Sequence, residues 1–300
     1  MNGFLNLLKP PGMTSSDAVV HIRRKLPKGT RIGHGGTLDP DAAGVLPICI
    51  GKATRLFDYI IDKQKTYIGE LRLGVTTQTD DASGRILTTR PVNADAAAVE
   101  ETLKAFTGEI MQRPPVYSAL KSGGEAFYKK ARRGETVDLQ ARKARIDELE
   151  ILSCLAADRY LLRVHCGKGV YIRALMRDIG EKLGCGGHMS FLLRSESGVF
   201  TVNEAVALDE LSDMEKLASA LKPLDAPLKH FPMLPVDEAR RKNVLDGQTI
   251  RPDWILGALP DLSGPLRVYI GGDFAGMAQW EPDGAHMKCM LLDRETGNEE

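Results

Sequence analysis

The sequence predicts an α+β protein in which a mixed, mostly antiparallel sheet is flanked by helices. Short or alternating apolar segments typical of strands recur along the chain, at residues 4–8, 63–75, 146–151, 160–166 and 188–194. Segments with helical periodicity separate them, at residues 17–26, 93–108 and beyond 171. A proline-rich linker and several short strands end the chain, so we expect a large domain over 1–230 and a small β-rich domain over 231–300.

Capping residues and glycines define the predicted helix ends in the large domain. Ser15 or Ser16 can cap the helix over 17–26, directly after a rigid Pro-Pro-Gly turn. Asn93 can cap the helix over 93–108, and Gly108 can stop it. Further predictions are a proline-rich loop at 109–124, a basic helix at 125–133 and an acidic, helical stretch at 195–230.

The charges are balanced overall but not along the chain. Lys+Arg and Asp+Glu both number 40. Residues 1–60 carry eight basic against four acidic side chains, and residues 104–145 carry ten against four. Residues 195–238 reverse this, with nine acids against three lysines. The basic segments either converge into a surface for a polyanion or form an ordinary solvated mosaic, and both interpretations stay open.

The cysteine spacing and the hydropathy of the chain argue against a disulfide-bonded or membrane-spanning protein. Five scattered cysteines form no Cys-x-x-Cys pair, and no apolar run approaches the ~18 residues of a membrane span. We therefore expect a reduced, cytoplasmic protein without a membrane partner. Cys185 and His188 could form half of a metal site, but no second half accompanies them, so no metal is predicted. Gly51 and Lys52 do not belong to a nucleotide-binding P-loop, because Leu46 stands where that motif requires glycine and Ala53 where it requires Ser or Thr.

The first candidate site is the stretch 33–48, which holds one acid, Asp39, between a leucine and a proline. Pro40 favours an extended conformation at Asp39, and Gly33, Gly35 and Gly36 can take positive φ or allow close backbone approach. A carboxylate on such a stiff loop is well placed to face a ligand. The plainer alternative is a turn in which Asp39 accepts backbone N–H bonds.

Two later segments carry further candidates. Tyr67 begins the strand over 63–75 and is either a platform for stacking a base or a half-buried core residue. Tyr171 and Arg173 follow a glycine-rich turn where a helix begins. An arginine beside a partly buried carboxylate keeps that carboxylate ionised, whereas an isolated arginine at a helix start is usually a surface residue. Lys9 is either a phosphate contact or a solvated lysine.

In combination, these segments resemble the TruB family of bacterial tRNA pseudouridine-55 synthases. The matching motifs follow the order of that family and cover about residues 1–200; they lie at 9–15, 33–40, 44–47, 65–67, 73–74, 114–121 and 169–173. The end of the chain resembles, more weakly, the small RNA-binding β-barrel called PUA. The resemblance implies the pseudouridine synthase fold, with an RNA-binding insertion at about 109–145.

The resemblance also implies an isomerase that needs no cofactor and converts a uridine of the tRNA T stem-loop to pseudouridine. Asp39 matches the catalytic aspartate, which either attacks C1′ or takes the 2′ proton. The other implied site residues are Tyr67, which stacks on the base; Tyr171; Arg173, which pairs with the aspartate; His34, which fills the space of the flipped nucleotide; and Leu192, a substrate contact. Leu193 departs from the arginine common at that place in the family.

We weigh two alternatives to this enzyme. The first is an RNA-binding chaperone that folds tRNA without chemistry, and it is compatible with the enzyme. The second is the guide-RNA-dependent relative of archaea and eukaryotes, which we disfavour because the chain lacks a long basic tail. We therefore expect a monomer that acts on tRNA without a guide RNA.

Overall fold

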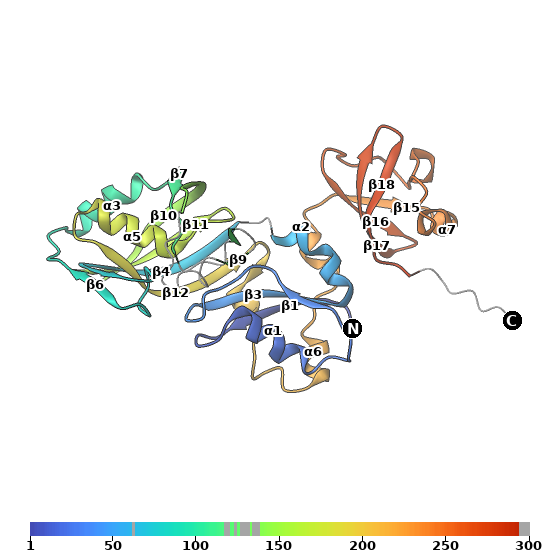
Figure 1. Cartoon of the computed structure of the whole chain (residues 1–300). Coiled ribbons are helices and arrows are strands. Elements are labelled where there is room, and N and C mark those ends of the chain that lie inside the picture. The colour runs from blue at the N-terminus through green and yellow to red at the C-terminus, as the bar shows by residue number, and fades with distance from the viewer. Residues whose placement is uncertain (62–63, 117–120, 123–124, 127–132, 134–138, 294–300) are drawn as a thin grey trace.

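The arrangement of strands in a long, bent sheet determines where the candidate residues lie. The computed structural model describes residues 1–61, 64–116, 121–122, 125–126, 133 and 139–293. The molecule is elongated, with α3 (Ala96–Lys104) and β6 (Ile86–Thr89) at one end and a separate C-terminal sheet at the other (Figure 1). No helix in the described part of the chain is both long and apolar enough to cross a bilayer.

The main sheet has ten strands and is mixed but mostly antiparallel, as predicted. The strands of its central path are, in spatial order, β14 (Val206–Ala207), β1 (Gly3–Lys9), β3 (Ala43–Ile50), β12 (Gly187–Ser197), β4 (Lys65–Leu73), β11 (Arg159–Cys166), β10 (Arg142–Ala156) and β7 (Gly108–Gln112). Two short strands pair beside this path, β2 (Ile32–His34) with β3 and β13 (Phe200–Thr201) with β12. Among the described strands of this sheet, the β1–β14 and β3–β12 pairs are parallel and the others are antiparallel.

Helices flank this sheet at several places. The longest, α5 (Ile172–Lys182), packs on β12 and β4, and α3 packs on β10. The remaining α-helices in the part of the chain that the structure describes are α1 (Ser15–Arg23), α2 (Phe57–Ile61), α6 (Met214–Ser219) and α7 (Arg241–Leu245). Short 3₁₀ helices lie at Gly51–Leu56, Val202–Glu204, Ala226–Leu228, Glu238–Arg240 and Pro252–Trp254. The layered arrangement confirms the predicted class.

Both predicted helix caps differ from the structure by one or two residues: the cap of α1 was predicted too late in the chain and that of α3 too early. Thr14 caps α1 in a capping box with Asp17, because the Ser15 hydroxyl is already bonded to the backbone of Leu38. Asp95, not Asn93, caps α3 through a bond from the Ala98 amide. The α3 helix ends at Lys104, one turn before the predicted stop.

Several predicted loops and helices differ from the structure. Residues 108–112 form the edge strand β7, which pairs with β10, where a loop was predicted. Residues 195–230 are mostly strands and turns; α6 is the single α-helix in that stretch. The predicted basic helix at 125–133 falls almost entirely outside the described residues.

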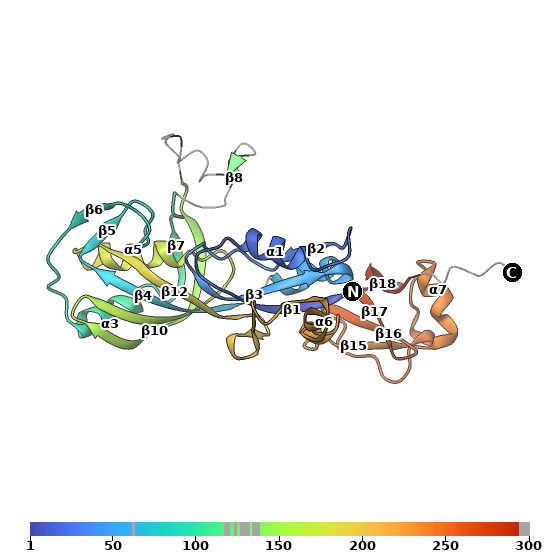
Figure 2. The ribbon, with the colours of Figure 1, turned by 90° about the horizontal axis from the view of Figure 1, so that it is seen from below.

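Two small strand pairs belong to the large domain besides the main sheet. Strand β5 (Val75–Thr77) pairs with β6, and β8 (Lys121–Ser122) pairs with β9 (Glu125–Ala126). Strand β8 stands clear of the main sheet in Figure 2.

The C-terminal unit is a four-stranded sheet in the order β15 (Met233–Val236), β16 (Pro265–Ile270), β17 (Asp273–Glu281) and β18 (Gly284–Met290). Its β-rich character was predicted, while closure into a PUA-like barrel and the division of the chain at residue 230 stay predictions. A buried apolar cluster joins this sheet to the main one and includes Phe4 and Cys49 from the large domain, Leu228 from the linker, and Met277 and Cys289 from the small sheet.

We expect Leu228→Ala to destabilise the folded protein, because Leu228 is fully buried in this shared cluster. The smaller apolar surface and the cavity left behind predict a fall of about 2–5 kcal/mol in the free energy of unfolding. The exposed neighbour Lys229 provides the control, since Lys229→Ala should change it by less than about 0.5 kcal/mol. Urea unfolding measures both, and equal effects of the two substitutions would contradict a shared core.

Candidate active site

The Asp39 carboxylate and the Arg173 guanidinium form a two-point ion pair, although they are 134 positions apart in the chain. Arg173 Nη2 donates to Asp39 Oδ1 at 3.0 Å, and Arg173 Nε lies 2.9 Å from Asp39 Oδ2. The Arg173 side chain is 8% exposed, whereas the Asp39 side chain is 35% exposed. The pair therefore presents a fixed carboxylate to an open cavity while hiding its counter-ion.

The loop after β5 holds Arg173 from its other side. Arg173 Nη1 donates to the Thr79 carbonyl at 3.1 Å and lies 3.6 Å from Asp81 Oδ2. Asp81 Oδ1 accepts bonds from the Thr79 hydroxyl and from the amide and hydroxyl of Ser83. Asp80 takes a left-handed φ of 60° at the tip of this loop, which is unusual for a residue other than glycine. These contacts fix the guanidinium that fixes Asp39.

The backbone carbonyls around Asp39 are all hydrogen-bonded. Every carbonyl from residue 36 to residue 40 accepts a bond, in order from Arg194 Nη2, Arg194 Nη1, Ser15 Oγ, the Ala42 amide, and the Gly12 amide together with Lys9 Nζ. Of the three glycines predicted to have special freedom, Gly36 has a left-handed φ of 118°. Gly35 instead packs closely on Pro47. The loop is therefore rigid through its backbone, as its composition suggested.

Arg194 is a buried cation that ties this loop to the sheet. It is 1% exposed, and its Nε donates to the Val45 carbonyl at 2.8 Å. It lies opposite Tyr67 in the β12–β4 register and hydrogen-bonds to that side chain. Gly44 has a φ of 118°, and a Cβ there would lie 2.2 Å from the Arg194 carbonyl oxygen. Only glycine fits where β3 passes Arg194.

Two cavities meet at the Asp39–Arg173 pair. The smaller, of about 380 Å³, is lined by Tyr67 and Tyr171. The larger, of about 870 Å³, is lined by His34 and by the loops at 14–16 and 79–83. Asp39, Arg173 and Leu192 line both. The structure thus brings together the predicted residues Asp39, Arg173, Tyr67, Tyr171, Leu192 and His34.

Lys9, the remaining predicted contact, lies behind the loop. It is fully buried, and its ammonium donates to the carbonyls of Pro10, Met13 and Pro40 at 2.7–3.0 Å. Burial lowers the pKa of Lys9 to about 8. These three bonds use all of its donors, so Lys9 holds the Asp39 loop against the first turn. A phosphate contact by Lys9 stays a prediction that requires one of these bonds to break.

The electrostatics of the site follow from partial burial. Removal from water raises the pKa of Asp39 above its ordinary value, and the Arg173 guanidinium opposes that rise. Burial also raises the pKa of Tyr67, so its hydroxyl stays protonated at neutral pH. Burial and the nearby charge of Arg194 lower the pKa of His34, which keeps that imidazole neutral. The site therefore combines one carboxylate with neutral aromatic side chains.

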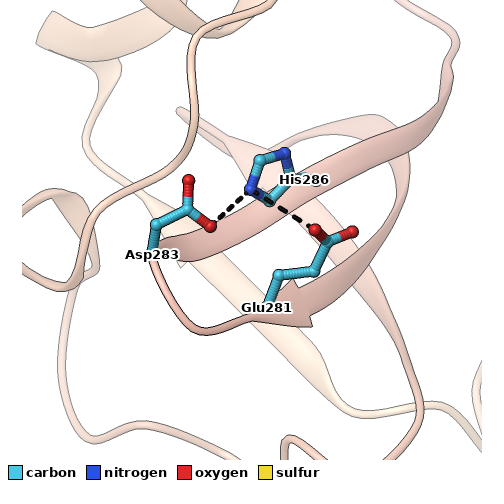
Figure 3. A group of neighbouring side chains, drawn as sticks. All are labelled: Glu281, Asp283 and His286. Atoms are coloured by element: carbon cyan, nitrogen blue, oxygen red, sulfur yellow. Dashed lines mark hydrogen bonds and ion pairs between the residues drawn. The ribbon is translucent and has the colours of Figure 1, made fainter.

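One group with the residue types of a metal site lies far from this cavity, in the hairpin between β17 and β18 (Figure 3). His286 Nε2 donates to Asp283 Oδ1 at 2.8 Å and lies 3.9 Å from Glu281 Oε2. Lys288 Nζ donates to the other Glu281 oxygen at 2.6 Å. Protein groups thus already engage each ligand-type side chain, and the cluster forms a hydrogen-bonded hairpin turn.

Family models match most of the large domain. A model described as the N-terminal domain of TruB family pseudouridylate synthases matches residues 23–172, and one described as the tRNA pseudouridylate synthase B C-terminal domain matches residues 173–229. The chain belongs to the TruB family. It is accordingly an isomerase of the pseudouridine synthase class. The Asp39–Arg173 pair links the two matched segments, because Arg173 is the first residue of the second.

Relatives and solved structures agree with this family. The tRNA pseudouridine synthase B of Alkaliphilus oremlandii is 43% identical over 92% of both chains, and that of Heliobacterium modesticaldum is 44% identical over 93% of this chain and 86% of its own. A Cbf5–Nop10–Gar1 complex has a chain that is 25% identical with a TM-score of 0.70, covering 97% of this chain and 84% of that one. An H/ACA RNP bound to a substrate RNA matches at 23% identity and a TM-score of 0.74, covering 98% and 86%, which supports the fold.

Four residues that organise this TruB site were missed at the sequence level. Asp81 was given no role, Ser15 was predicted only as a helix cap, and Arg194 was predicted only as the last residue of the strand-like segment 188–194. Gln112 was placed in a loop, but its side-chain amide brackets the backbone N–H and carbonyl of Tyr171 at 2.8 and 3.1 Å. An arginine inside the apolar run 188–194 was the one available signal, because such a charge must find partners when buried.

Replacing Arg194 should raise the pKa of His34 and slow the reaction. Arg194→Met removes a positive charge that lowers this pKa, and it removes the donors of three loop and strand carbonyls. NMR titration of the His34 imidazole measures the first effect, and single-turnover kinetics should show a loss of at least about tenfold. The exposed Arg72→Met serves as the control. An unchanged or lower His34 pKa would contradict the assigned role of Arg194.

Proposed function

We propose that this protein converts the uridine at position 55, in the T loop of tRNA, to pseudouridine, with Asp39 as the catalytic carboxylate. One observation carries the proposal: a carboxylate held at two points by Arg173 lies on the wall shared by two cavities. The names of the relatives, tRNA pseudouridine synthase B, support tRNA as the substrate. Their identity over most of the chain supports action without a guide RNA.

The smaller cavity suits the target base, and the larger one suits the sugar-phosphate chain around it. A base in a folded loop must leave its stack, which costs a few kcal/mol, and stacking on an aromatic ring returns about 1–3 kcal/mol. Tyr67 takes that role in the proposal, with Leu192 and Tyr171 enclosing the base. His34, neutral and on the wall of the larger cavity, fills the place that the flipped nucleotide leaves.

The reaction is an isomerisation, so its atoms balance without a co-substrate. The C1′–N1 bond breaks, the uracil turns, a C1′–C5 bond forms, C5 loses its proton and N1 gains one. Asp39 either attacks C1′ or removes the 2′ proton, and both routes start from the ionised carboxylate. The two domains, 1–230 and 231–300, and the insertion at 109–145 then extend the RNA contact, with the terminal sheet as a PUA-like module.

The first test maps pseudouridine in a T-arm transcript incubated with the purified protein alone. We expect modification at position 55 by the wild type and none by Asp39→Asn, which should still bind the transcript. Asp58→Asn is the control, because Asp58 is an exposed acid of the large domain that lines neither cavity. Full activity of Asp39→Asn would remove Asp39 from the mechanism, whereas activity that appears only with a guide RNA would reassign the protein.

The second test uses pH. The rate should fall at acid pH as Asp39 becomes protonated, and this fall should begin above the ordinary carboxyl range because burial raises the pKa of Asp39. Arg173→Gln removes the charge that lowers this pKa, so the acid limb of the rate profile should move to higher pH. Arg173→Lys keeps a positive charge and should move it less. An acid limb that stays in place or moves to lower pH in Arg173→Gln would contradict the coupling.

A further inference from the structure

A further cavity, of about 790 Å³, opens beside the active site on the large domain. It lies between the C-terminal end of α1, the connection 24–31 and the strand β2, with one wall from the 3₁₀ helix Gly51–Leu56 and the start of α2. Helix α1 and strand β2 pack together and lie on the same side of β1 and β3 in Figure 2. We call this cavity the basic pocket.

The basic pocket combines positive charge with an apolar floor. Arg23, Lys28 and Arg31 line it and are exposed. Leu26, Ile32 and Phe57 provide apolar surface, and Thr30 and Thr54 provide hydroxyl groups. No carboxylate lines the pocket, and no acid of the described residues lies within ion-pair distance of the three cations. In a chain of zero net charge, such a pocket is a local positive field.

The basic pocket lies one short strand away from the active site. Gly33 lines the pocket, and the next residue, His34, lines the larger cavity that holds Asp39. At about 3.3 Å per residue, the three residues of β2 span about 10 Å. A nucleic-acid strand advances about 3.4 Å of axis per nucleotide, so this length corresponds to a few nucleotides. An RNA with one nucleotide in the active site can therefore reach the pocket with its neighbours.

We propose that the basic pocket is a second RNA subsite, which binds the ribose-phosphate backbone a few nucleotides from the target uridine. The inference rests on the proposed function and adds a specific contact to it. The three cations bind phosphate oxygens, and the apolar floor covers the sugar face. The Thr30 and Thr54 hydroxyls donate to the carbonyls of Pro27 and Gly51, so their oxygens accept a hydrogen bond from a ribose hydroxyl. Such contacts position the RNA without reading its sequence.

The test compares two variants that lose the same charge. The pocket variant carries Arg23→Ala, Lys28→Ala and Arg31→Ala. The control variant carries Lys104→Ala, Arg163→Ala and Lys222→Ala, whose native side chains are each already paired with a glutamate at 2.6–3.1 Å. For both, tRNA affinity is measured over a range of salt, together with KM and kcat for pseudouridine formation and a thermal melt.

We expect the pocket variant to raise Kd and KM at least tenfold near 0.1 M salt, with kcat within about twofold of the wild type. Its slope of log affinity against log salt should become shallower by up to about 0.9 for each phosphate that the variant no longer neutralises. The control variant should keep the wild-type slope. A pocket variant with the slope and KM of the control overturns the subsite.

The two proposals fail separately. If the wild type makes no pseudouridine, the proposed function fails, while the salt dependence of tRNA binding still tests the pocket. If the wild type is active and the pocket variant binds like the control, the pocket alone is refuted. If the pocket variant melts well below the wild type, the single variants Arg31→Ala and Lys28→Ala replace it. If both single variants keep the wild-type slope of log affinity against log salt, the subsite is again refuted.

Discussion

The ion pair between Asp39 and Arg173 is the constraint on which the rest of the site depends. It needs a loop before β3 and the first turn of α5 to meet, and the sheet order makes this possible because β3, β12 and β4 are neighbours. Helix α5 packs on two of these strands, so its first turn faces the loop. Tyr67 from β4 and Leu192 from β12 then line the same cavity. Three adjacent strands and one helix thus supply the side chains of the candidate site.

Two buried arginines stabilise the surroundings of this pair through different kinds of contact. Arg173 neutralises carboxylates, with Asp39 on one side and Asp81 on the other. Arg194 donates to backbone carbonyls, so its charge is not neutralised by a carboxylate. Burial lowers the pKa of both His34 and Lys9, and the charge of Arg194 adds to that effect. Dipoles and charges fixed before the substrate arrives need no reorganisation during the reaction. The carbonyl bonds from Lys9, Ser15 and Arg194 give the carboxylate this fixed position.

Much of the fold class and the site could be predicted from the sequence, because alternation, turn residues and the motifs around Asp39 and Arg173 are local signals. The strand order could not, since it depends on contacts between distant segments. Helix caps were misplaced by one or two residues where competing hydroxyls and acids lie together, as at Thr14 and Ser15. Arg194 and Gln112 were missed because most of their partners are backbone groups, whose positions cannot be read from the sequence.

The central claim is that the position of the Asp39 carboxylate, and not its charge alone, makes the site reactive. Asp39→Glu tests it most directly, because it keeps the charge and the possibility of pairing with Arg173 but lengthens the side chain by one methylene. Displacement of a reacting group by about 1 Å can cost about 100-fold in rate. We predict that the single-turnover rate of pseudouridine formation falls by at least that factor while RNA affinity is unchanged. A rate within about fivefold of the wild type would contradict the account.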